Sequence, residues 1–429
     1  MVISLHRKGG FVSKLLIDGG KTLSGEVKVQ GSKNSALPIL AASILSKGEN
    51  VFYNCPMLSD IDSSVRILRY LGCEVSRSCH TLMVKADGLS RDDIPEPLMR
   101  LMRSSVIFAG ALLAATGKAR ITFPGGCELG PRPIDLHLSA LRQLGAEITE
   151  RHGEIVFKAP KGGLKGATVT LGFPSVGATE NIIIAASLAK GTTVITNAAR
   201  EPEITDLADY LNACGAHIQG AGEGTIIIDG AENLYSTAHS IIPDRIVAAT
   251  LMSASAVTGS DITLNSVIKS HLDAIIPCFE HAGCNIEFNK GKMRIKSPQR
   301  LRSTGYIRTT PFPGFPTDAQ APVMAMAAVS EGITVFSENI FESRYKHVDE
   351  FVRLGANIRV EGKVAIVDGV RKLYSAPVSA KDLRGSAALV VAGLVAEGTT
   401  EVDTTEYLER GYEDIEVVLS SMGASIRKV

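Results

Sequence analysis

The stretch Ala319–Phe336, AQAPVMAMAAVSEGITVF, shows the pattern that decides the fold. An alanine-rich apolar run leads into Gly332, and a short segment rich in β-formers, Thr334–Phe336, follows. The apolar run predicts a buried helix, and the glycine supplies the left-handed residue that commonly ends one. After a polar loop, the sequence predicts an amphipathic helix over Val348–Leu354 that stops at Gly355.

This unit of about 70 residues recurs along the whole chain. One glycine follows an apolar or small pair and precedes Ala or Cys at six regularly spaced positions: Gly72, Gly145, Gly215, Gly283, Gly355 and Gly423. A second glycine precedes each of them: Gly48, Gly117, Gly191, Gly259, Gly332 and Gly398. Buried helices are expected over six alanine-rich runs: Ala36–Ser46, Val106–Ala115, Ala178–Lys190, Ile246–Val257, Ala319–Val329 and Ser386–Ala396.

Short strands are expected between the helices throughout the chain. They include Val51–Tyr53, Ile121–Phe123, Val194–Thr196, Asn285–Phe288, Lys292–Lys296, Asn357–Val360 and Val364–Val367. Alternating helices and strands indicate a mixed α/β fold. The strands Leu15–Asp18 and Gly25–Gln30 are expected to complete the last unit, which ends at Val429.

Closure of the chain on itself favours two globular domains of three units over a stacked solenoid. One domain is predicted to comprise residues 1–33 and 243–429, and the other residues 34–242. The crossovers between them are expected near Gln30–Asn34 and Ile242–Arg245.

The composition argues against several classes of protein. Lys and Arg number 45, as do Asp and Glu, so no basic excess favours wrapping of nucleic acid. No apolar run approaches the ~20 residues of a membrane span, and Met1–Gly20 lacks the apolar core of a signal peptide. Seven cysteines without a C-x-x-C pair suit a reducing cytoplasm. No metal-ligand spacing or phosphate-loop motif is present, so neither a metal nor another cofactor is expected.

The second unit departs from the repeat in the loop Pro124–Pro133, PGGCELGPRP, which carries about four extra residues. It places the thiol of Cys127 near the guanidinium of Arg132, and a nearby cation favours the reactive thiolate. The alternative, that Cys127 is a small buried hydrophobe, stays open from this pattern alone.

Charged residues also recur where the alanine-rich helices begin. The cations there are Lys33, Arg103, Arg245 and Arg384, and the acids are Asp244, Asp318 and Asp382. Six equivalent helix N-termini could converge on a cleft between the domains and bind anions. The acids could equally serve only as helix caps.

Several motifs, in order, resemble one enzyme family. They are Gly31–Pro38, the Cys127 loop continuing through Arg132–His137, Ala199–Glu203, Phe315–Asp318, Phe341–Arg344 and Arg410–Tyr412. From about Leu15 to Val429 the chain resembles the UDP-N-acetylglucosamine 1-carboxyvinyltransferases, which belong to the EPSP synthase superfamily. The resemblance implies an inside-out α/β barrel of two three-unit domains. It also implies phosphoenolpyruvate as donor, UDP-N-acetylglucosamine as acceptor, and a place in peptidoglycan precursor synthesis.

The resemblance further implies roles for individual residues. Asp318 would be the base and Cys127 the acid. Lys33, Arg132 and Arg410 would hold phosphoenolpyruvate, with Asn34 steadying the tetrahedral intermediate and Arg384 near the anion. The acceptor would contact Arg103, Arg132, Pro133, Ile134, Asp135, Leu136, Ser175, Val176, Asp318 and Ile340. Some relatives have Lys where this chain has Phe173. Phe173 cannot supply the positive charge that such a Lys would bring to the diphosphate.

Two rival interpretations remain. One is the sister enzyme that uses shikimate 3-phosphate as acceptor; it typically has Ser-Lys-Ser where this chain has Ser32-Lys33-Asn34, and it lacks a Cys127-type loop. The other is a catalytically silent paralogue that binds a nucleotide sugar. The presence of Lys33, Cys127 and Asp318 disfavours the silent paralogue.

Overall fold

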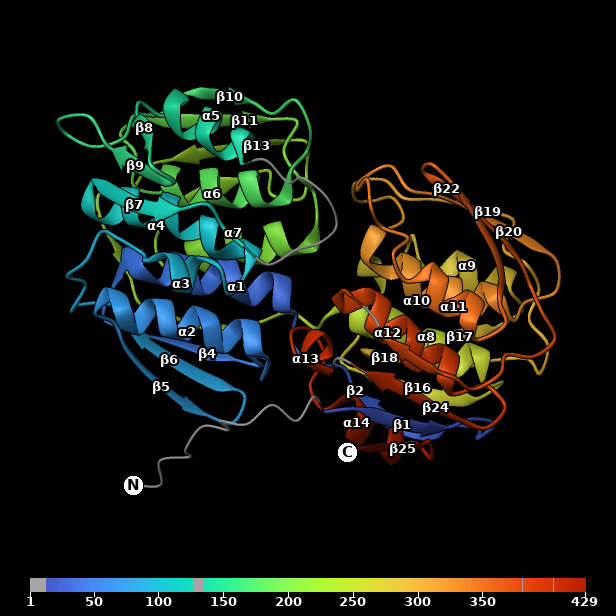
Figure 1. The fold of residues 1–429 in the computed structure, drawn as a ribbon. Coiled ribbons are helices and arrows are strands. Elements are labelled where there is room, and N and C mark those ends of the chain that lie inside the picture. The colour runs from blue at the N-terminus through green and yellow to red at the C-terminus, as the bar shows by residue number, and fades with distance from the viewer. Residues whose placement is uncertain (1–12, 126–133, 380, 404) are drawn as a thin grey trace.

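The computed structural model describes residues 13–125, 134–379, 381–403 and 405–429. Figure 1 shows two lobes side by side, one coloured blue to green and the other yellow to red with two blue strands from the start of the chain. Each lobe has its own cluster of buried apolar side chains. The first lobe's core draws on residues 36–241, and the second lobe's core draws on residues 15–29 and 246–426.

The first lobe begins with α1. Its helices are α1 (Lys33–Ala42), α2 (Ser59–Leu71), α3 (Glu96–Met99), α4 (Ile107–Thr116), α5 (Asp135–Gln143), α6 (Val176–Ala186) and α7 (Pro202–Ala213). Its strands are β3 (Ser46–Lys47), β4 (Glu49–Tyr53), β5 (Glu74–Ser78), β6 (Thr81–Lys85), β7 (Lys118–Thr122), β8 (Glu147–Arg151), β9 (Glu154–Lys158), β10 (Thr168–Thr170), β11 (Thr192–Thr196), β12 (His217–Gln219), β13 (Thr225–Asp229), β14 (Leu234–Tyr235) and β15 (Ala238–Ser240).

The second lobe takes two strands from the start of the described chain. Its helices are α8 (Arg245–Val257), α9 (Ile276–His281), α10 (Thr317–Ala328), α11 (Val348–Arg353), α12 (Leu383–Gly393), α13 (Thr405–Leu408) and α14 (Ile415–Ser421). Its strands are β1 (Leu15–Asp18), β2 (Ser24–Lys28), β16 (Asp261–Asn265), β17 (Asn285–Asn289), β18 (Lys292–Lys296), β19 (Tyr306–Arg308), β20 (Ile333–Ser337), β21 (Asn357–Glu361), β22 (Val364–Asp368), β23 (Pro377–Ser379), β24 (Thr399–Asp403) and β25 (Ser425–Lys428).

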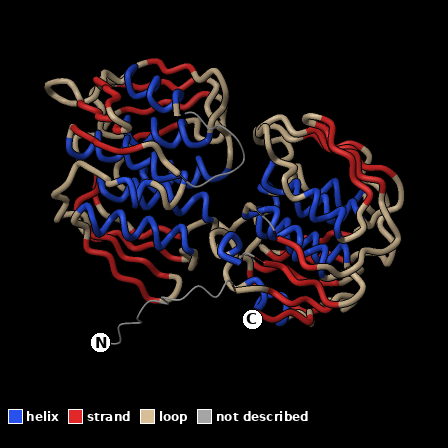
Figure 2. Tube along the Cα trace, in the orientation of Figure 1, coloured by secondary structure: helices blue, strands red, loops and turns tan. Residues whose placement is uncertain are grey.

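The four-stranded sheets share one pattern, in which a parallel edge strand joins three antiparallel ones. The orders are β15-β4-β6-β5, β10-β11-β13-β12, β2-β16-β18-β17, β19-β20-β22-β21 and β23-β24-β1-β25. A three-stranded sheet has the order β7-β9-β8. Most helices occupy the middle of each lobe, and the strands lie toward its outside (Figure 2).

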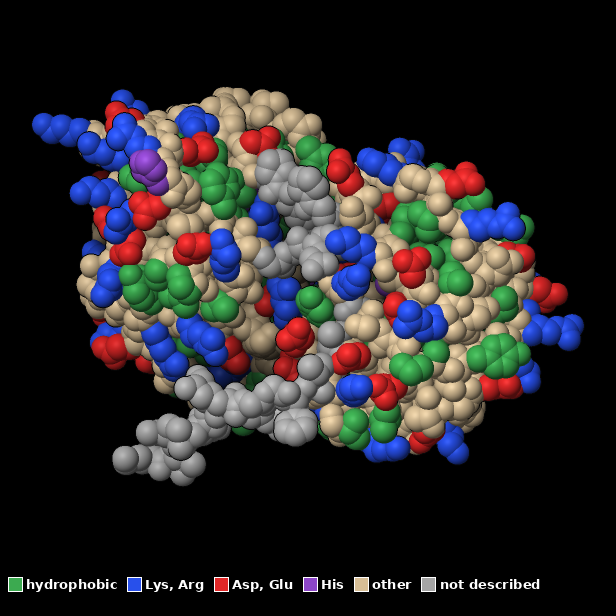
Figure 3. All heavy atoms as spheres, viewed as in Figure 1, with side chains coloured by type: hydrophobic (Ala, Val, Ile, Leu, Met, Phe, Trp, Pro, Cys, Tyr) green, Lys and Arg blue, Asp and Glu red, His purple; other side chains and the backbone are tan. Residues whose placement is uncertain are grey.

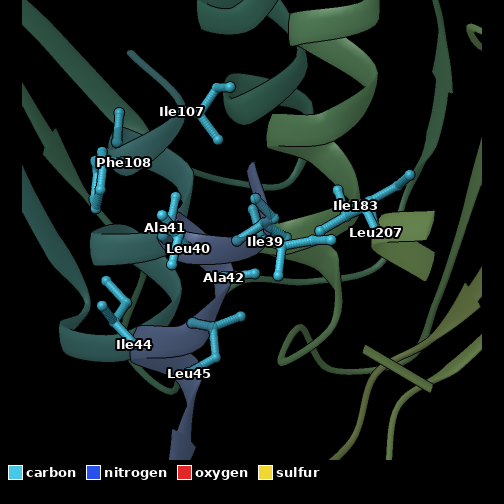
Figure 4. Close-up of a cluster of buried hydrophobic side chains, with 14 of the residues drawn as sticks. Ile39, Leu40, Ala41, Ala42, Ile44, Leu45, Ile107, Phe108, Ile183 and Leu207 are labelled. Carbon is cyan, nitrogen blue, oxygen red and sulfur yellow. The ribbon is translucent and has the colours of Figure 1, made fainter. Parts of the chain in front are cut away.

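The alanine-rich helices form the centre of each lobe because they are apolar on every side. All thirteen residues of α8 are buried. In the first lobe, Ile39 and Leu40 of α1 lie near Phe108 of α4 and Ile183 of α6 (Figure 4). Small alanine side chains let such helices approach closely, so the core is built from helix packed on helix.

The expected helices and strands are present, with shifted ends. The αL cap predicted for the alanine-rich helices is found at Gly117, which caps α4. At the other five units the helix ends earlier; α10, for example, stops at Ala328, and Gly332 lies directly before β20. All twelve repeat glycines nevertheless have a positive φ, such as 102° at Gly332, so the pattern marked left-handed turns correctly.

The N-terminal strands join the second lobe, but in two different sheets. β1 lies between β24 and β25 and pairs antiparallel with both, which confirms the expected completion of the last unit. β2 pairs instead with β16, so the prediction that it completes the last unit was wrong. β2 supplies the parallel edge strand that the sheet of β16, β17 and β18 would otherwise lack.

Two connections cross between the lobes and lie side by side. Gly31 and Pro243 form an antiparallel bridge. The amide of Ser32 donates to the carbonyl of Ile242 at 2.7 Å, and the amide of Asp244 donates to that of Gln30 at 2.9 Å. The crossovers therefore fall where the sequence predicts them, directly before α1 and α8.

Candidate functional site

A cleft of about 1150 Å³ lies between the two lobes and receives residues from both. Residues at the N-terminal ends of six helical segments line it: Lys33, Arg103, Val176, Arg245, Asp318 and Arg384. Basic and acidic side chains gather on both sides of the boundary between the lobes in Figure 3. The predicted convergence of the helix starts on a cleft is therefore confirmed, and the positive ends of the helix dipoles there favour anions.

Two of the three acids at these helix starts are caps. Asp244 accepts hydrogen bonds from the amides of Ile246 and Val247 at 2.8 and 3.1 Å. Asp382 accepts from the amides of Arg384 and Gly385 at 3.1 and 3.0 Å. Their side chains are thus committed to the backbone, as the capping alternative expected.

Asp318 is different, because its carboxylate faces two guanidinium groups. Arg384 donates from Nε and Nη2 to Oδ2 at 3.2 and 3.0 Å, and Arg344 donates to Oδ1 at 3.0 Å. Both arginines are almost fully buried, whereas the Asp318 side chain keeps 29% of its surface exposed. Arg384 is itself fixed by the hydroxyl of Tyr412, at 3.1 Å. Asp318 is thus held rigidly and presented to the cleft.

A second charged group joins Lys33 to Arg410. Asp60, in the first turn of α2, lies 2.6 Å from Lys33 Nζ and 2.9 Å from Arg410 Nε. Burial alone would raise the pKa of Asp60, but Lys33 and Arg410 hold it below its usual value. Burial lowers the pKa of Lys33 despite the pull of Asp60. Two cations from different lobes therefore meet at one buried carboxylate.

A third group is acidic. Arg245 donates from Nε and Nη2 to the two carboxylate oxygens of Glu203, at 3.1 and 3.3 Å. Glu201 accepts from the amide of Phe312 at 3.4 Å, and the Arg245 guanidinium lies 5.4 Å from the centre of the Phe312 ring. Burial, reinforced by Glu203 and Glu201, raises the pKa of Glu180 well above 4.5. This wall of the cleft thus holds a carboxyl group that favours its neutral form.

The cleft wall of the first lobe also carries Asp135 and Leu136, at the start of α5. The next residue, His137, accepts a hydrogen bond at Nδ1 from the side-chain amide nitrogen of Asn181 at 3.0 Å. Burial, helped by Arg103, lowers the pKa of His137 to about 4, so the ring is neutral near pH 7. Asn181 also donates to the carbonyl of Val106, directly before α4, at 3.1 Å. Its side chain thus ties α6 to the starts of α4 and α5.

The remaining predicted site residues fall into three groups. Asn34, Ser175, Val176 and Ile340 line the cleft with the residues above. Ile134 lies directly before α5, where its side chain is buried. Cys127, Arg132 and Pro133 lie outside the described residues. Phe173 also lines the cleft, with 42% of its surface exposed.

Asp60 and Arg344 are among the cleft residues for which the sequence predicted no role. Asp60 carried a usable signal, because an acid lies on the buried face of an amphipathic helix, in phase with Ile67 and Leu71. Arg344 was noted only as part of a motif. Its pairing with Asp318, across 26 positions of sequence, carries no local signal.

In the part of the chain that the structure describes, no group of three or more His, Cys, Asp or Glu side chains could hold a metal ion. No helix among the described residues is long and apolar enough to cross a membrane. The six described cysteines are unpaired, and burial raises the pKa of several, that of Cys55 to about 12. The thiols whose pKa burial raises therefore resist ionisation.

Comparison with known proteins identifies the relatives of this chain. The family model for EPSP synthase (3-phosphoshikimate 1-carboxyvinyltransferase) matches residues 17–419. UDP-N-acetylglucosamine 1-carboxyvinyltransferase 2 of Caldanaerobacter subterraneus subsp. tengcongensis is 49% identical over 97% of this chain and 100% of its own length. UDP-N-acetylglucosamine 1-carboxyvinyltransferase of Trichlorobacter lovleyi is 48% identical over 97% of this chain and 99% of its own.

Two solved structures share the fold. The enolpyruvyl transferase NikO from Streptomyces tendae superposes with a TM-score of 0.88 at 24% identity, over 97% of this chain and 99% of its own. EPSP synthase from Acinetobacter baumannii gives a TM-score of 0.72 at 19% identity, with the same coverage. The mixed α/β architecture is therefore that of enolpyruvyl transferases.

Proposed function

Because the chain belongs to the EPSP synthase family and, within it, to the UDP-N-acetylglucosamine 1-carboxyvinyltransferases, we propose that the cleft between its lobes is the site of enolpyruvyl transfer. The protein transfers the enolpyruvyl group of phosphoenolpyruvate to the 3′-hydroxyl of UDP-N-acetylglucosamine and releases phosphate, a step of peptidoglycan precursor synthesis. The observation that carries the site assignment is the convergence of six helix starts, with their charged side chains, on one cleft.

The reaction is an addition followed by an elimination. First the sugar oxygen bonds to C2 of phosphoenolpyruvate and loses its proton, while C3 gains one. Then the bond from C2 to the phosphate oxygen breaks, C3 loses a proton, and the double bond re-forms. Such a path needs a base for the hydroxyl, an acid for C3 and cations for the phosphate and carboxylate.

Asp318 is the proposed base for the hydroxyl. Its two ion pairs fix the carboxylate while leaving part of it open to the cleft, as a base that meets a bound hydroxyl requires. Cys127 is the proposed acid toward C3. It lies two residues after Gly125, which packs closely against Arg100, and itself lies outside the described residues.

The donor is proposed to bind Lys33, Asn34 and Arg410, together with Arg132 of the Cys127 loop. Each charge-assisted hydrogen bond to the phosphate or carboxylate contributes about 1.5–3 kcal/mol. Lys33 and Arg410 already share Asp60, so the donor's anionic groups meet a cation pair that is preassembled rather than one gathered on binding.

The acceptor is proposed to bind along the cleft wall formed by the helix starts of the first lobe and by Asp318 and Ile340 of the second lobe. Its contacts would be Arg103, Arg132, Pro133, Ile134, Asp135, Leu136, Ser175, Val176, Asp318 and Ile340. Seven of these ten line the cleft: Arg103, Asp135, Leu136, Ser175, Val176, Asp318 and Ile340. Phosphoenolpyruvate and UDP-N-acetylglucosamine are thus the proposed partners.

The proposal extends to the fold. We propose two domains, residues 1–33 with 243–429 and residues 34–242, each an inside-out α/β barrel of three copies of the ~70-residue unit. They match the two lobes except at Lys33, which begins α1 of the first lobe. Separate apolar cores and the shared strand order of the four-stranded sheets support this division. We also propose that the enzyme works in the cytoplasm, where its phosphorylated donor is made available.

The decisive experiment measures phosphate release from phosphoenolpyruvate with each of two acceptors. We expect release with UDP-N-acetylglucosamine and none with shikimate 3-phosphate. Release with shikimate 3-phosphate alone would favour the sister enzyme, and no release from folded protein would favour the silent paralogue.

A test of the residues uses Asp318→Asn. The variant is expected to lose 10²–10⁴-fold in kcat, the usual contribution of a positioned base. Asp349→Asn, in the first turn of α11 and outside the cleft, is the matched control and should leave kcat unchanged. Equal kcat values for the parent and Asp318→Asn would remove Asp318 from the mechanism.

A further inference from the structure

We infer that Asp60 is a positioning residue, which holds Lys33 and Arg410, one cation from each lobe, at a common point of the donor site. The inference rests on the proposed function of that site. Asp60 itself has 3% of its surface exposed and lies in the first turn of α2. The carboxylate acts on the donor through the two cations.

The geometry uses both oxygens of the carboxylate. Oδ2 lies 2.6 Å from Lys33 Nζ and accepts from Arg410 Nη2 at 3.4 Å, and Oδ1 accepts from Arg410 Nε at 2.9 Å. The backbone reinforces the contact, since the amide of Ser59 donates to the carbonyl of Glu409 at 3.0 Å. Arg410, although part of the second lobe's chain, is therefore anchored to the first lobe.

The charges around Lys33 give Asp60 a second task. Burial lowers the pKa of Lys33, and Arg410, which follows α13, and Arg384 on α12 lower it further. Asp60 on α2 raises it. Asp244, the cap of α8, accepts from the Lys33 backbone amide at 3.3 Å. The Asp60 carboxylate, which contacts the Lys33 ammonium, therefore favours the protonated form of Lys33. A neutral lysine would not attract the donor's phosphate.

The neighbouring acid Asp62 provides a matched control. It occupies the same first turn of α2 and has the same effect on the helix dipole. Its carboxylate, however, is 62% exposed and pairs with Arg77 at 3.1 Å, away from Lys33 and Arg410. A difference between equivalent changes at Asp60 and Asp62 therefore isolates the contact with the two cations.

The experiment compares the pH profiles of kcat/KM for phosphoenolpyruvate in the parent, Asp60→Asn and Asp62→Asn. We expect the alkaline limb of Asp60→Asn to lie at least one pH unit lower, an about tenfold loss along that limb. Asp62→Asn should keep the parent's profile. An alkaline limb that does not move in folded Asp60→Asn would overturn the inference, because loss of a purely structural contact leaves the limb in place.

Asp60→Glu serves if circular dichroism shows that the Asn variant does not fold. It keeps the charge but displaces the carboxylate by about one bond length. We expect an about tenfold lower kcat/KM for phosphoenolpyruvate, with KM for UDP-N-acetylglucosamine within about twofold of the parent. An unchanged kcat/KM for phosphoenolpyruvate would contradict the positioning role.

Acetylation of Lys33 by acetic anhydride, followed by mass spectrometry, separates this inference from the proposed function. Only the neutral amine reacts with acetic anhydride. Lys33 should therefore react several-fold faster at pH 8 in folded Asp60→Asn than in the parent. Equal rates would overturn the role of Asp60 even in an active enzyme. No phosphate release by the parent would refute the proposed function while leaving the acetylation result intact.

Discussion

Replacement of Glu180 by Gln tests the electrostatics of the cleft through stability. Glu180 lies on α6, lines the cleft and has 4% of its surface exposed. Burial, together with Glu203 and Glu201, raises its pKa well above the ordinary 4.5. Gln has nearly the same shape as the protonated carboxyl group and cannot ionise. The change Glu180→Gln therefore removes the titration and little else.

The sign of the effect follows from proton binding in the two states. Between pH 4.5 and the raised pKa, Glu180 stays protonated in the folded protein and ionises in the unfolded chain. The folded state then binds more protons, so the free energy of unfolding falls as the pH rises. The slope approaches about 1.4 kcal/mol per pH unit within this window. The variant should lack this slope and become relatively more stable at each higher pH.

The measurement is amide hydrogen exchange along α6 at several pH values between 5 and 8, after correction for the intrinsic exchange rates. Exchange reports the opening free energy of the lobe that holds Glu180, without assuming that both lobes unfold together. We expect the difference between variant and parent to widen with pH. A constant difference over this range would refute the reasoning, since it would mean that Glu180 titrates alike in both states.

Three further changes test other parts of the structure. Arg245→Met leaves Glu203 buried without its partner and should destabilise by about 3–5 kcal/mol, seen as a lower Tm; the double variant with Glu203→Gln should recover most of the loss. Burial lowers the pKa of His137 from 6.5 to about 4, so the folded protein resists its protonation. The free energy of unfolding is therefore unaffected by His137 above pH 6.5 and falls by about 3 kcal/mol as the pH drops toward 4. His137→Gln should flatten that acid dependence in denaturation curves, and an unaltered dependence would contradict the assignment. Leu40→Ala, in the fully buried centre of α1, should cost about 2–5 kcal/mol in urea unfolding; a cost below 1 kcal/mol would contradict tight packing there.

The periodic features of the fold were predictable from the sequence. A glycine needed for a left-handed turn acts locally, so the repeat glycines located turns in every unit. The ends of the alanine-rich helices were less predictable. In α10 the helix stops at Ala328, and a turn at Val329 and Ser330 and the bridged residue Glu331 precede Gly332. Tertiary packing, and not the glycine, decides where the last helical bond forms.

Partners far apart in the sequence were not predictable. The residues Gly25–Gln30 have the pattern of a strand. Nothing in that pattern predicts pairing with β16 rather than with a strand of the last unit. Likewise, Lys33 and Arg410 are recognisable as cations at helix-associated positions, whereas their meeting at Asp60 depends on the packing of the two lobes. The charged residues were therefore found one by one, and their pairing required the structure.

The placement of β1 between β24 and β25 sets the order in which the protein can mature on the ribosome. The first lobe contains every partner of its own core and can close while later residues are still being synthesised. β2 must wait for β16, and β1 must wait for β24 and β25, with unpaired edges exposed to other chains in the meantime. The second lobe is therefore completed last, although β1 leaves the ribosome before every helix of the first lobe.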